Sequence, residues 1–427
     1  PTDERITPTS VAVDQGVGLN GGRRLYVSTN TGQVLVYEDP FATDTRPDYE
    51  LLGLPGGAVK VESFGEDLLA VHNTVSVFFY REGSPDRLTF QTSGSGVSTL
   101  SSPCTAGSIS AIAGGASNLF LACSASAGTC PGGVASPPAD CSNGSTAAAC
   151  YTTGCGVIHA YQYVSDVDVP NQDNGLPIAN AFPPVFSGFA LISDMKFSGN
   201  ALFVGDSRSR VLRLSMADTA ATNVLRDPMP ADAIPATQGT QNIWEDALVT
   251  GANSTDPDLD LAFGQDDFST FEANRGFSNG LYSAQGLQFP ASIALDAFGG
   301  LWAVDSVSAG EARVLRYTDA NSSLDSVADS VLGQPNFQLV YPNTIEAAGF
   351  GMAMDVAVDW RTETVYVADP QANRVLQFDS IASTTGAEAN RAIGQANLQD
   401  YRANRGQTVD GLSLNNPQRV SVDPNTG

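Results

Sequence analysis

A repeat of 63 to 64 residues constrains the fold of this chain more than any other feature. The phrase Gly-Gln-Pro-Asn-Phe at 333–337 has aligned copies at 264–268 and 394–398. Each copy leads into a short β-type run that ends in aspartate, and these aspartates recur at intervals of 63 and 64 residues. Regular spacing of this length indicates a fold built by repeating one supersecondary unit.

Within one repeat, short β-type runs alternate with turn residues. The unit that follows 333–337 contains runs at 354–359, 364–369 and 373–378, each rich in apolar residues and bounded by Pro, Gly, Asn or Asp. Runs of this length with such boundaries predict β-strands. Three or four of them in each repeat are typical of one blade of a β-propeller.

The same pattern extends towards the N-terminus, where the copies are less regular. Further candidate strands group into four blades, within residues 10–53, 59–80, 109–161 and 191–214. Together with the two regular units that follow, they predict an all-β fold. We expect a β-propeller of six four-stranded blades, with residues 1–427 forming one domain.

Residues 419–423 predict the inner strand of a seventh blade, begun at the C-terminus. Blade counting leaves two interpretations. Either the natural protein continues beyond Gly427 as part of a longer chain or assembly, or this strand closes the ring beside the first blade. Because the first blade already has an inner strand, we favour the longer chain.

Two segments depart from the repeat. Residues 123–156 form a cysteine-rich insertion in the third blade, and residues 218–260 form a long inter-blade loop rich in Pro, Asn, Asp and Thr. Loops mounted on a rigid scaffold commonly carry recognition. We therefore expect a protein or glycan ligand to bind on the loop face that carries them.

All six cysteines fall in one window of the chain: Cys104, Cys123, Cys130, Cys141, Cys150 and Cys155. An even number of cysteines in a Gly-, Ser- and Pro-rich segment predicts a local disulfide framework. It also predicts an oxidising location, which is extracellular, at the cell surface or periplasmic. A metal site is the alternative, but the spacing lacks paired Cys-x-x-Cys knuckles. The connectivity stays open, because six cysteines permit many pairings.

The charge of the chain argues against some partners. The formal net charge is −25, and only two of the basic residues are lysines, Lys60 and Lys196. A field of this sign repels phosphate backbones and anionic membrane surfaces, which disfavours nucleic-acid binding. No stretch approaches the roughly 18 apolar residues of a membrane span, so no membrane insertion is expected within this chain.

The regular blades resemble the NHL-repeat β-propeller family, in a long-linker bacterial type whose blades are joined by a Gly-Gln-Pro-Asp/Asn-Phe phrase. The resemblance is clearest from Gly264 onwards and weakest between residues 57 and 165. In this family an aspartate follows the second strand of a blade and an arginine opens the third. Three blades carry both residues: Asp206 and Arg210, Asp305 and Arg313, and Asp369 and Arg374.

These Asp/Arg pairs invite a functional interpretation, but their recurrence favours a structural one. A catalytic site would occur once, whereas a framework contact occurs once in each blade. An aspartate after a strand accepts N–H groups of the turn, and an arginine across the hairpin pairs with it. We therefore interpret them as structural blade pairs. The first three blades lack such pairs and must hold their turns differently.

One loop has the alternating oxygen groups of a calcium site. Asp166, Asp168, Asn171 and Asp173 lie in a run of acidic and amide residues, and Ca²⁺ is the one cofactor that the sequence suggests. The run lacks the Gly and Glu that an EF-hand loop has at its sixth and twelfth positions. A solvated turn of Asx residues is the competing interpretation.

The sequence thus predicts a secreted or cell-surface β-propeller that acts as a non-catalytic binding or scaffold module. The alternative is a metal-dependent propeller hydrolase or lyase with a divalent ion in the central funnel. Peptide-amidating lyases of the NHL group need several histidines around zinc, and this chain has only His72 and His159. A third class is a structural repeat within a surface fibre, for which the abrupt C-terminal strand is the only support.

Overall fold

Hairpins of short β-strands make up almost all of the regular structure. The computed structural model describes residues 8–13, 24–38, 46–54, 56–57, 59–64, 68–81, 85, 90–92, 95–97, 100–101, 104, 107–114, 118–125, 155–163, 178–198, 201–215, 241–242, 261–265, 273–276, 282–306, 312–321, 325–338, 345–359, 361–379, 385–408 and 410–422. Within these residues the only helices are short 3-10 turns at Ala273–Gly276, Pro370–Ala372 and Ala403–Gly406. None of the described helices has the length and apolar character needed to cross a membrane.

Six sheets, each of mainly antiparallel strands, form the blades. Blades 1 and 2 contain β1 (Pro8–Val13), β2 (Arg24–Thr29), β3 (Val34–Glu38) and β4 (Tyr49–Glu50), then β5 (Lys60–Phe64), β6 (Leu68–His72), β7 (Ser76–Arg81) and β10 (Leu100–Ser101). Blade 3 contains β11 (Ser108–Gly114), β12 (Asn118–Ala125), β13 (Cys155–Tyr163) and β14 (Ile178–Phe189), with a parallel fifth strand, β18 (Gln241–Asn242). A separate hairpin pairs β8 (Phe90–Thr92) with β9 (Ser95–Val97).

The last three blades are the regular ones. Blade 4 contains β15 (Ile192–Ser198), β16 (Ala201–Asp206), β17 (Arg210–Ser215) and β19 (Leu261–Phe263). Blade 5 contains β20 (Pro290–Leu295), β21 (Leu301–Asp305), β22 (Arg313–Tyr317) and β23 (Ser330–Leu332). Blade 6 contains β24 (Asp355–Asp359), β25 (Thr364–Asp369), β26 (Arg374–Phe378) and β27 (Arg391–Ile393).

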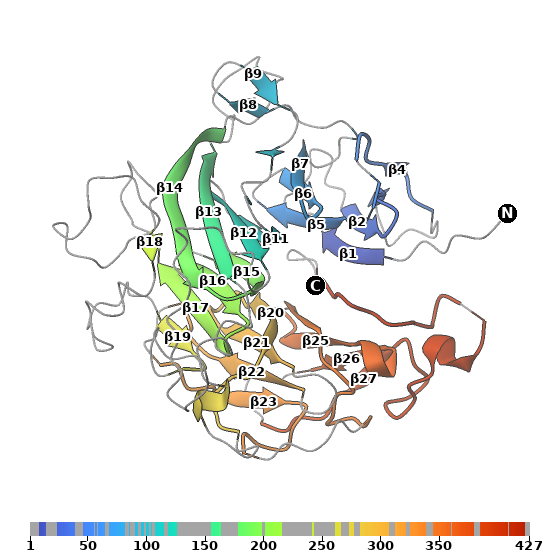
Figure 1. Cartoon of the computed structure of the whole chain (residues 1–427). Helices are drawn as coiled ribbons and strands as arrows, with labels where there is room; N and C mark the ends of the chain where they lie inside the picture. Colours follow the sequence, from blue (N-terminus) through green and yellow to red (C-terminus); the bar gives the residue numbers. More distant parts are fainter. Residues whose placement is uncertain are drawn as a thin grey trace.

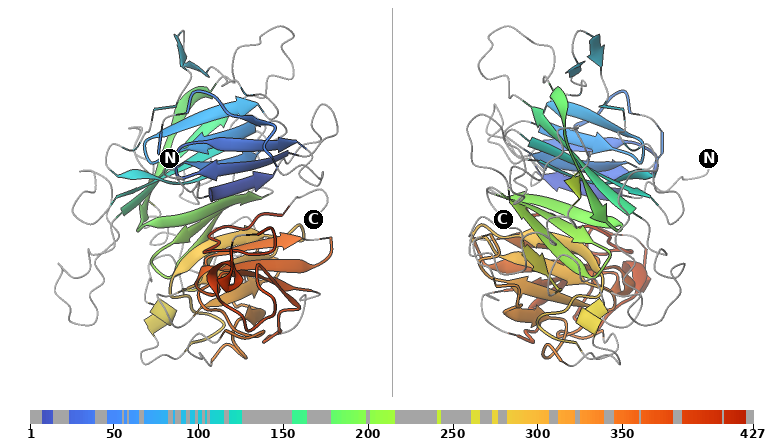
Figure 2. Two further views of the ribbon diagram at one scale, coloured as in Figure 1. Left: turned by 90° about the vertical axis from the view of Figure 1, so that its right-hand side faces the viewer. Right: turned by 60° about the vertical axis from the view of Figure 1, so that its left-hand side comes forward.

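The first strands of successive blades lie side by side around one axis, in the order β1, β5, β11, β15, β20 and β24. In Figure 1 the blades fan out around the centre of the molecule, from blade 1 in dark blue to blade 6 in orange and red. Figure 2 shows the same stack of sheets from two further directions. The predicted fold class, an all-β propeller with six blades, is confirmed.

The expected seventh inner strand takes a different form. Residues 419–422 have no regular secondary structure and pair with no strand in the described part of the chain. The backbone N–H of Val420 donates to Oδ2 of Asp355 on β24 at 2.8 Å, and the segment shares a cavity with β1. An inner strand normally forms its ladder with the second strand of its own blade. Here a side-chain acceptor holds the segment at the axis instead.

The apolar core lies between neighbouring blades. Apolar clusters join blade 1 to blade 2, blade 3 to blade 4, blade 4 to blade 5 and blade 5 to blade 6, so the strands between two clusters are buried on both faces. Leu202 and Val204 of β16 belong to one cluster with Phe120 of β12, and Val304 of β21 belongs to another with Val367 of β25. Burial on both faces explains why these strands are apolar throughout rather than alternating.

The recurring Gly-Gln phrase ends the fourth strand of blades 4, 5 and 6. Its glycines have φ angles of +88°, +81° and +90°, a region that favours glycine: Gly264, Gly333 and Gly394. The glutamine that follows is buried and donates Nε2–H to a backbone carbonyl in the turn between the second and third strands. These contacts are Gln265 to Ser209 at 2.9 Å, Gln334 to Ala312 at 3.2 Å and Gln395 to Asn373 at 2.8 Å. The phrase that marks the repeat therefore ties each fourth strand to its blade.

The two segments that depart from the repeat start from opposite ends of their blades. Residues 126–154 connect β12 to β13, the second and third strands of blade 3. Residues 216–260 connect β17 to β19, the third and fourth strands of blade 4. Because neighbouring strands are antiparallel, these connections leave from opposite faces of the propeller. The two connections therefore do not start from one face, and the binding of a ligand on a loop face that carries both segments stays a prediction.

Candidate functional site

The three Asp/Arg pairs occupy one position in their blades. Each aspartate is the last residue of a second strand, and its register partner is the arginine that opens the third strand. The arginine Nε lies 3.0, 2.9 and 2.9 Å from one carboxylate oxygen in the pairs Arg210 with Asp206, Arg313 with Asp305 and Arg374 with Asp369. All six residues are at most 1% exposed. The longer connection between Asp305 and Arg313 leaves this geometry unchanged.

Each pair also reaches the loop that precedes the first strand of its blade. In blade 5, Oδ1 of Asp305 accepts the N–H groups of Gln288 and Phe289, both at 2.8 Å, and Arg313 Nη2 donates to the carbonyl of Gly286 at 2.7 Å. The aspartates of blades 4 and 6 accept N–H groups from the equivalent loops. Apart from the bond to the paired arginine, the hydrogen bonds of the carboxylates are thus directed to backbone groups, and the pairs close the junction at which one blade passes into the next.

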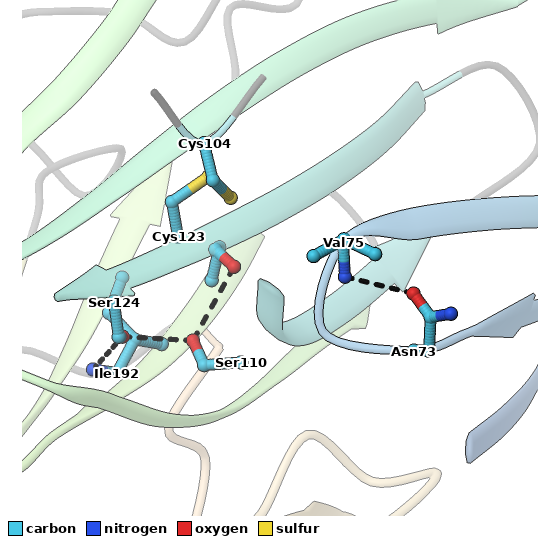
Figure 3. Close-up of a disulfide and its surroundings, with 8 residues drawn as sticks. Asn73, Val75, Cys104, Ser110, Cys123, Ser124 and Ile192 are labelled. Atoms are coloured by element: carbon cyan, nitrogen blue, oxygen red, sulfur yellow. Dashed lines mark hydrogen bonds between the residues drawn. A yellow bond between two sulfur atoms is a disulfide. The ribbon is translucent and has the colours of Figure 1, made fainter. Parts of the chain in front are cut away.

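Blade 3 uses a disulfide at the same junction. The strand register places Cys123 where blades 4 and 5 have Asp206 and Asp305. Cys123 is bonded to Cys104, in the segment before β11 (Figure 3). The predicted disulfide bonding is confirmed for this pair. The bond links a second strand to the loop before the first strand, as the aspartates do with hydrogen bonds, so it belongs to the scaffold.

The hairpin β12–β13 extends two residues past this junction, to the register pair Ala125 and Cys155. Within the extension, Oγ of Ser124 lies 2.9 Å from Oγ of Ser110 on β11 and accepts the backbone N–H of Ile192 on β15 at 3.0 Å (Figure 3). The base of the cysteine-rich segment is therefore fixed both to its own blade and to the next one.

Several predicted site residues lie outside the described residues. They are Cys130, Cys141 and Cys150, and the calcium candidates Asp166, Asp168, Asn171 and Asp173. Of Cys155 only the backbone is described. Across the ranges that the structure does describe, no three His, Cys, Asp or Glu side chains converge as they would around a metal ion. The calcium site and the other disulfides stay predictions.

A different set of residues meets at the axis. On the first strand of each blade, one residue occupies an equivalent register against the second strand, and residues 419–422 supply a seventh. We call these seven the axial ring: Ser10, Lys60, Ala111, Asp194, Ser292, Asp355 and Arg419. Two residues further along the same strand face, most positions carry alanine, but β5 has Glu62 and β15 has Lys196.

Three successive members of the axial ring are connected by hydrogen bonds. Ser292 Oγ lies 3.1 Å from Oδ2 of Asp194 and 2.6 Å from Oδ1 of Asp355. Arg419 Nη1 lies 3.6 Å from Oδ1 of Asp355, and Lys196 Nζ lies 3.6 Å from Oδ1 of Asp194. Because a hydroxyl has one proton to donate, Ser292 donates to one of the two carboxylates at a time.

Burial and nearby charges give the two aspartates different proton affinities. Burial raises the pKa of Asp355, and the charge of Arg419 offsets this only in part. Burial would also raise the pKa of Asp194, but the charges of Lys196 and Arg419 outweigh it and lower that pKa. The pKa of Asp355 is therefore raised and that of Asp194 lowered, although both carboxylates contact the same hydroxyl.

Lys60 and Glu62 lie at an axial cavity of about 280 Å³, which is lined mainly by β1, β5, β24 and residues 419–422. Neither side chain forms an ion pair or hydrogen bond with another described residue. Burial lowers the pKa of Lys60, and the charge of Arg419 lowers it further. Burial raises the pKa of Glu62, and Lys196 offsets part of that change. The cavity thus holds two unpaired groups of opposite charge.

Sequence reasoning did not single out this cluster. The available signal was that both lysines of the chain stand in predicted inner strands, where buried apolar residues are the rule. The interpretation of the chain by repeats directed attention to the Asp/Arg pairs, which recur, and away from residues that occur once. Only the closed arrangement of the blades brings Lys60, Lys196 and Arg419 to one axis.

Six blades around a polar axis define this chain as a β-propeller. No protein-family model and no curated protein matches it. Among solved structures, it is similar to the WD40 repeats of RRP9, with 9% identity and a TM-score of 0.49 over 99% of this chain and 85% of that chain. A chain of a mitotic checkpoint complex is 9% identical, with a TM-score of 0.45 over 100% of this chain and 89% of that chain.

A third similar structure is a chain of the Chaetomium thermophilum Polycomb Repressive Complex 2. It is 11% identical, with a TM-score of 0.40 over 75% of this chain and 58% of that chain. Similarities at these scores carry no argument about function. The class of the protein rests on its own blades and their order around the axis.

Proposed function

We propose that this chain is an exported propeller of the NHL type that acts as a binding module for a protein partner. Its recognition element is the cysteine-rich segment between β12 and β13. The observation that carries the proposal is the bracing at the base of this segment, where the Cys104–Cys123 disulfide and the hydrogen bonds of Ser124 meet. A rigid mount reduces the conformational entropy lost when a long insertion binds a partner.

Support for the NHL type comes from the framework contacts. The Asp/Arg pairs and the Gly-Gln phrase recur in blades 4, 5 and 6 with the same geometry. Support for export comes from the Cys104–Cys123 bond, because disulfides persist in extracellular and periplasmic compartments and are rare in the cytosol. Alkylation of the protein as isolated, without reductant, is expected to leave Cys104 and Cys123 unmodified. Ready alkylation of both would contradict export.

The recognition element is tested by replacing it with a tight turn. Because Ala125 and Cys155 are register partners, Asn-Gly in place of residues 126–154 closes a two-residue hairpin, and Cys155→Ser removes a thiol left over by the replacement. The wild type is used to isolate partners from the exported proteins of its source. Each purified partner is then titrated against both forms.

The turn variant is expected to keep the melting temperature of the wild type and to lose partner binding. A variant in which residues 218–239 are shortened, leaving β18 in place, is the matched control and should bind normally. Undiminished binding by the turn variant would refute the proposed recognition element. Binding to glycans and to no protein would refute the proposed class of partner.

The alternative class, a metal-dependent propeller hydrolase or lyase, needs carboxylates that are free to coordinate an ion at the axis. Asp194 accepts the N–H of Ile293 at 3.1 Å as well as its contact with Ser292, and Asp355 accepts the N–H of Val420 at 2.8 Å. Because these carboxylates already accept hydrogen bonds, they are less available to coordinate a metal ion, which favours the binding module over the enzyme. One tightly held divalent ion per purified chain would instead favour the enzyme.

A further inference from the structure

Two unpaired groups of opposite charge leave the same face of one inner strand. Lys60 and Glu62 are two residues apart on β5, so their Cα atoms are roughly 7 Å apart and their side chains point to one side. They form no ion pair with each other or with any other residue that the structure describes. The corresponding positions on the adjacent inner strands carry short side chains, among them Ser10 on β1 and Ala113 on β11. Space is therefore left beside both groups.

Two further cations line the same cavity, Arg419 from the C-terminal segment and Lys196 from β15, and Lys196 has an ion-pair partner in Asp194 at 3.6 Å. Arg419 lines the cavity together with Lys60, and its charge is the strongest one acting on Lys60. The ion-pair partner of Arg419 is Asp355, at 3.6 Å, whose oxygens already contact Ser292 and Val420. Two cations that converge on a cavity repel each other unless an anionic group lies between them.

We propose that the axial cavity binds a small zwitterion of the amino-acid class, with its carboxylate between Lys60 and Arg419 and its ammonium group against Glu62. A simple anion would leave Glu62 unpaired, and a simple cation would leave Lys60 unpaired, so a ligand with both charges satisfies the site best. The volume of about 280 Å³ lies just below the range of pockets for drug-sized ligands, which suits a molecule of amino-acid size. This site does not depend on the recognition role of residues 126–154.

Three matched probes test the proposal on the wild-type protein. β-Alanine carries both charged groups, propionate only the carboxylate and propylamine only the amine. Calorimetric titration is expected to show β-alanine binding at least about tenfold more tightly than either analogue, because each gains only part of the charge-assisted contacts. Equal affinities for β-alanine and propionate, or for β-alanine and propylamine, would overturn the proposal.

A spectroscopic measurement locates the ligand. Since the chain has two lysines, protein labelled with ¹³C-lysine gives two Cε signals, and the signal lost in Lys60→Met belongs to Lys60. That signal is expected to shift when β-alanine is added to the wild type. A Lys60 signal that stays in place at saturating β-alanine would place any binding elsewhere and would also overturn the proposal.

Two variants separate the two charged contacts. Glu62→Gln is expected to reduce the affinity for β-alanine to that for propionate, and Lys60→Met is expected to weaken both ligands by about tenfold or more. Glu50→Gln, at an exposed position on β4, is the matched control and should leave all affinities unchanged. The melting temperature of each variant shows whether it is folded. If a variant is not folded, the calorimetric comparison and the Lys60 signal of the wild type decide the proposal.

Discussion

Individual charged residues in this protein fall into two groups that differ in their surroundings. The Asp/Arg pairs of the turns are buried and fully engaged with backbone groups, as Asp369 and Arg374 illustrate. Lys60 and Glu62 at the axis border a cavity and have no close partner among the described residues. A charged residue that recurs in each blade and has all its hydrogen-bond partners builds the scaffold. A charged residue that occurs once and has no ion-pair partner is a better candidate for binding.

Removing one member of a turn pair is expected to be costly. Asp369→Ala should lower the free energy of unfolding by about 3 to 5 kcal/mol, because the buried charge of Arg374 would lose its partner. Glu388→Ala, at an exposed position, is the control and should change it by no more than about 0.5 kcal/mol. Urea unfolding measures both. Similar small losses in the two variants would contradict a structural role for the pair.

His72 is expected to make the protein sensitive to acid. Burial lowers the pKa of His72 to about 3, and the charge of Lys60 adds to this. Between the ordinary pKa of 6.5 and about 3, the unfolded chain binds a proton that the folded chain does not. Stability should therefore fall as the pH falls through this window, with a slope of up to about 1.4 kcal/mol per pH unit.

The variant His72→Gln should lose this contribution to the slope. Chemical denaturation over the same pH window compares the two proteins, and the difference between their curves isolates the histidine from the carboxyl groups. Parallel curves would show that His72 is not buried in its neutral form.

At the scale of the elements, the same junction is closed by different chemistry in different blades. Asn73 accepts the N–H groups of Val75 and Ser76 in blade 2, at 2.9 and 2.8 Å. Blade 3 has the Cys104–Cys123 disulfide, and blades 4 to 6 have the Asp/Arg pairs. At this point a blade requires a short link across the turn, or back to the loop that precedes its first strand. Several residue types supply such a link.

The disulfide is expected to contribute a large share of the stability of blade 3. It closes a loop with a sequence separation of 19 residues. In the chain-entropy model, a loop of this size corresponds to about 3 kcal/mol. The double variant Cys104→Ser, Cys123→Ser should therefore show a lower free energy of unfolding by about this amount. If the variant unfolded at the same denaturant concentration as the wild type, the disulfide would not contribute to the free energy of unfolding as expected.

The glycine of the recurring phrase is expected to tolerate no side chain. Gly333 has a φ of +81°, and a Cβ there would lie 2.1 Å from Phe350. Gly333→Ala should lower the free energy of unfolding by more than about 1 kcal/mol, since both the backbone and the packing must adjust. Gly411→Ala is the matched control, because no atom lies within 4 Å of a Cβ at that position. Thermal unfolding compares the two, and equal melting temperatures would contradict this account.

At the scale of the whole molecule, the blades meet in a polar axis. The chain of contacts from Asp194 through Ser292 to Asp355 and then to residues 419–422 links three consecutive blades to the C-terminal segment. These residues lie far apart in the sequence and come from different sheets. The polar axis therefore forms only when the blades assemble into a ring. Substitutions at the axis should change the stability of the whole propeller rather than of one blade.

Arg419 is expected to control the pKa of Asp355. Its charge is the strongest that lowers the pKa of Asp355, so Arg419→Gln should raise this already raised pKa further. A carboxyl with a raised folded-state pKa destabilises the fold as the pH rises above its unfolded-state value. The variant should therefore lose more stability at mildly alkaline than at mildly acidic pH.

Urea unfolding at both pH values tests this expectation, with Arg391→Gln at an exposed position as the control. An equal loss of stability at the two pH values would show that Arg419 does not act through the charge of Asp355. A direct ¹³C titration of the Asp355 carboxyl would then identify the group that does.

The amino-acid sequence by itself determined the fold class, the division into blades and most of the strands. Local chemistry suffices for these features: apolar runs mark strands, turn residues end them, and the repeat of 63 to 64 residues shows that one unit recurs. It also indicated that Asp305 and Arg313 belong together, because a hairpin makes the two residues neighbours. The register partners of a hairpin are close in sequence, so a pattern along the chain reports them.

Only the tertiary structure decided which residues meet across the ring. It paired Cys104 with Cys123 among the many pairings that six cysteines permit, and it showed that the two irregular segments leave their blades at opposite ends. It also brought Lys60, Glu62 and Arg419 to one cavity. These contacts join residues that no local pattern relates, because their proximity arises from the closure of six sheets around a common axis.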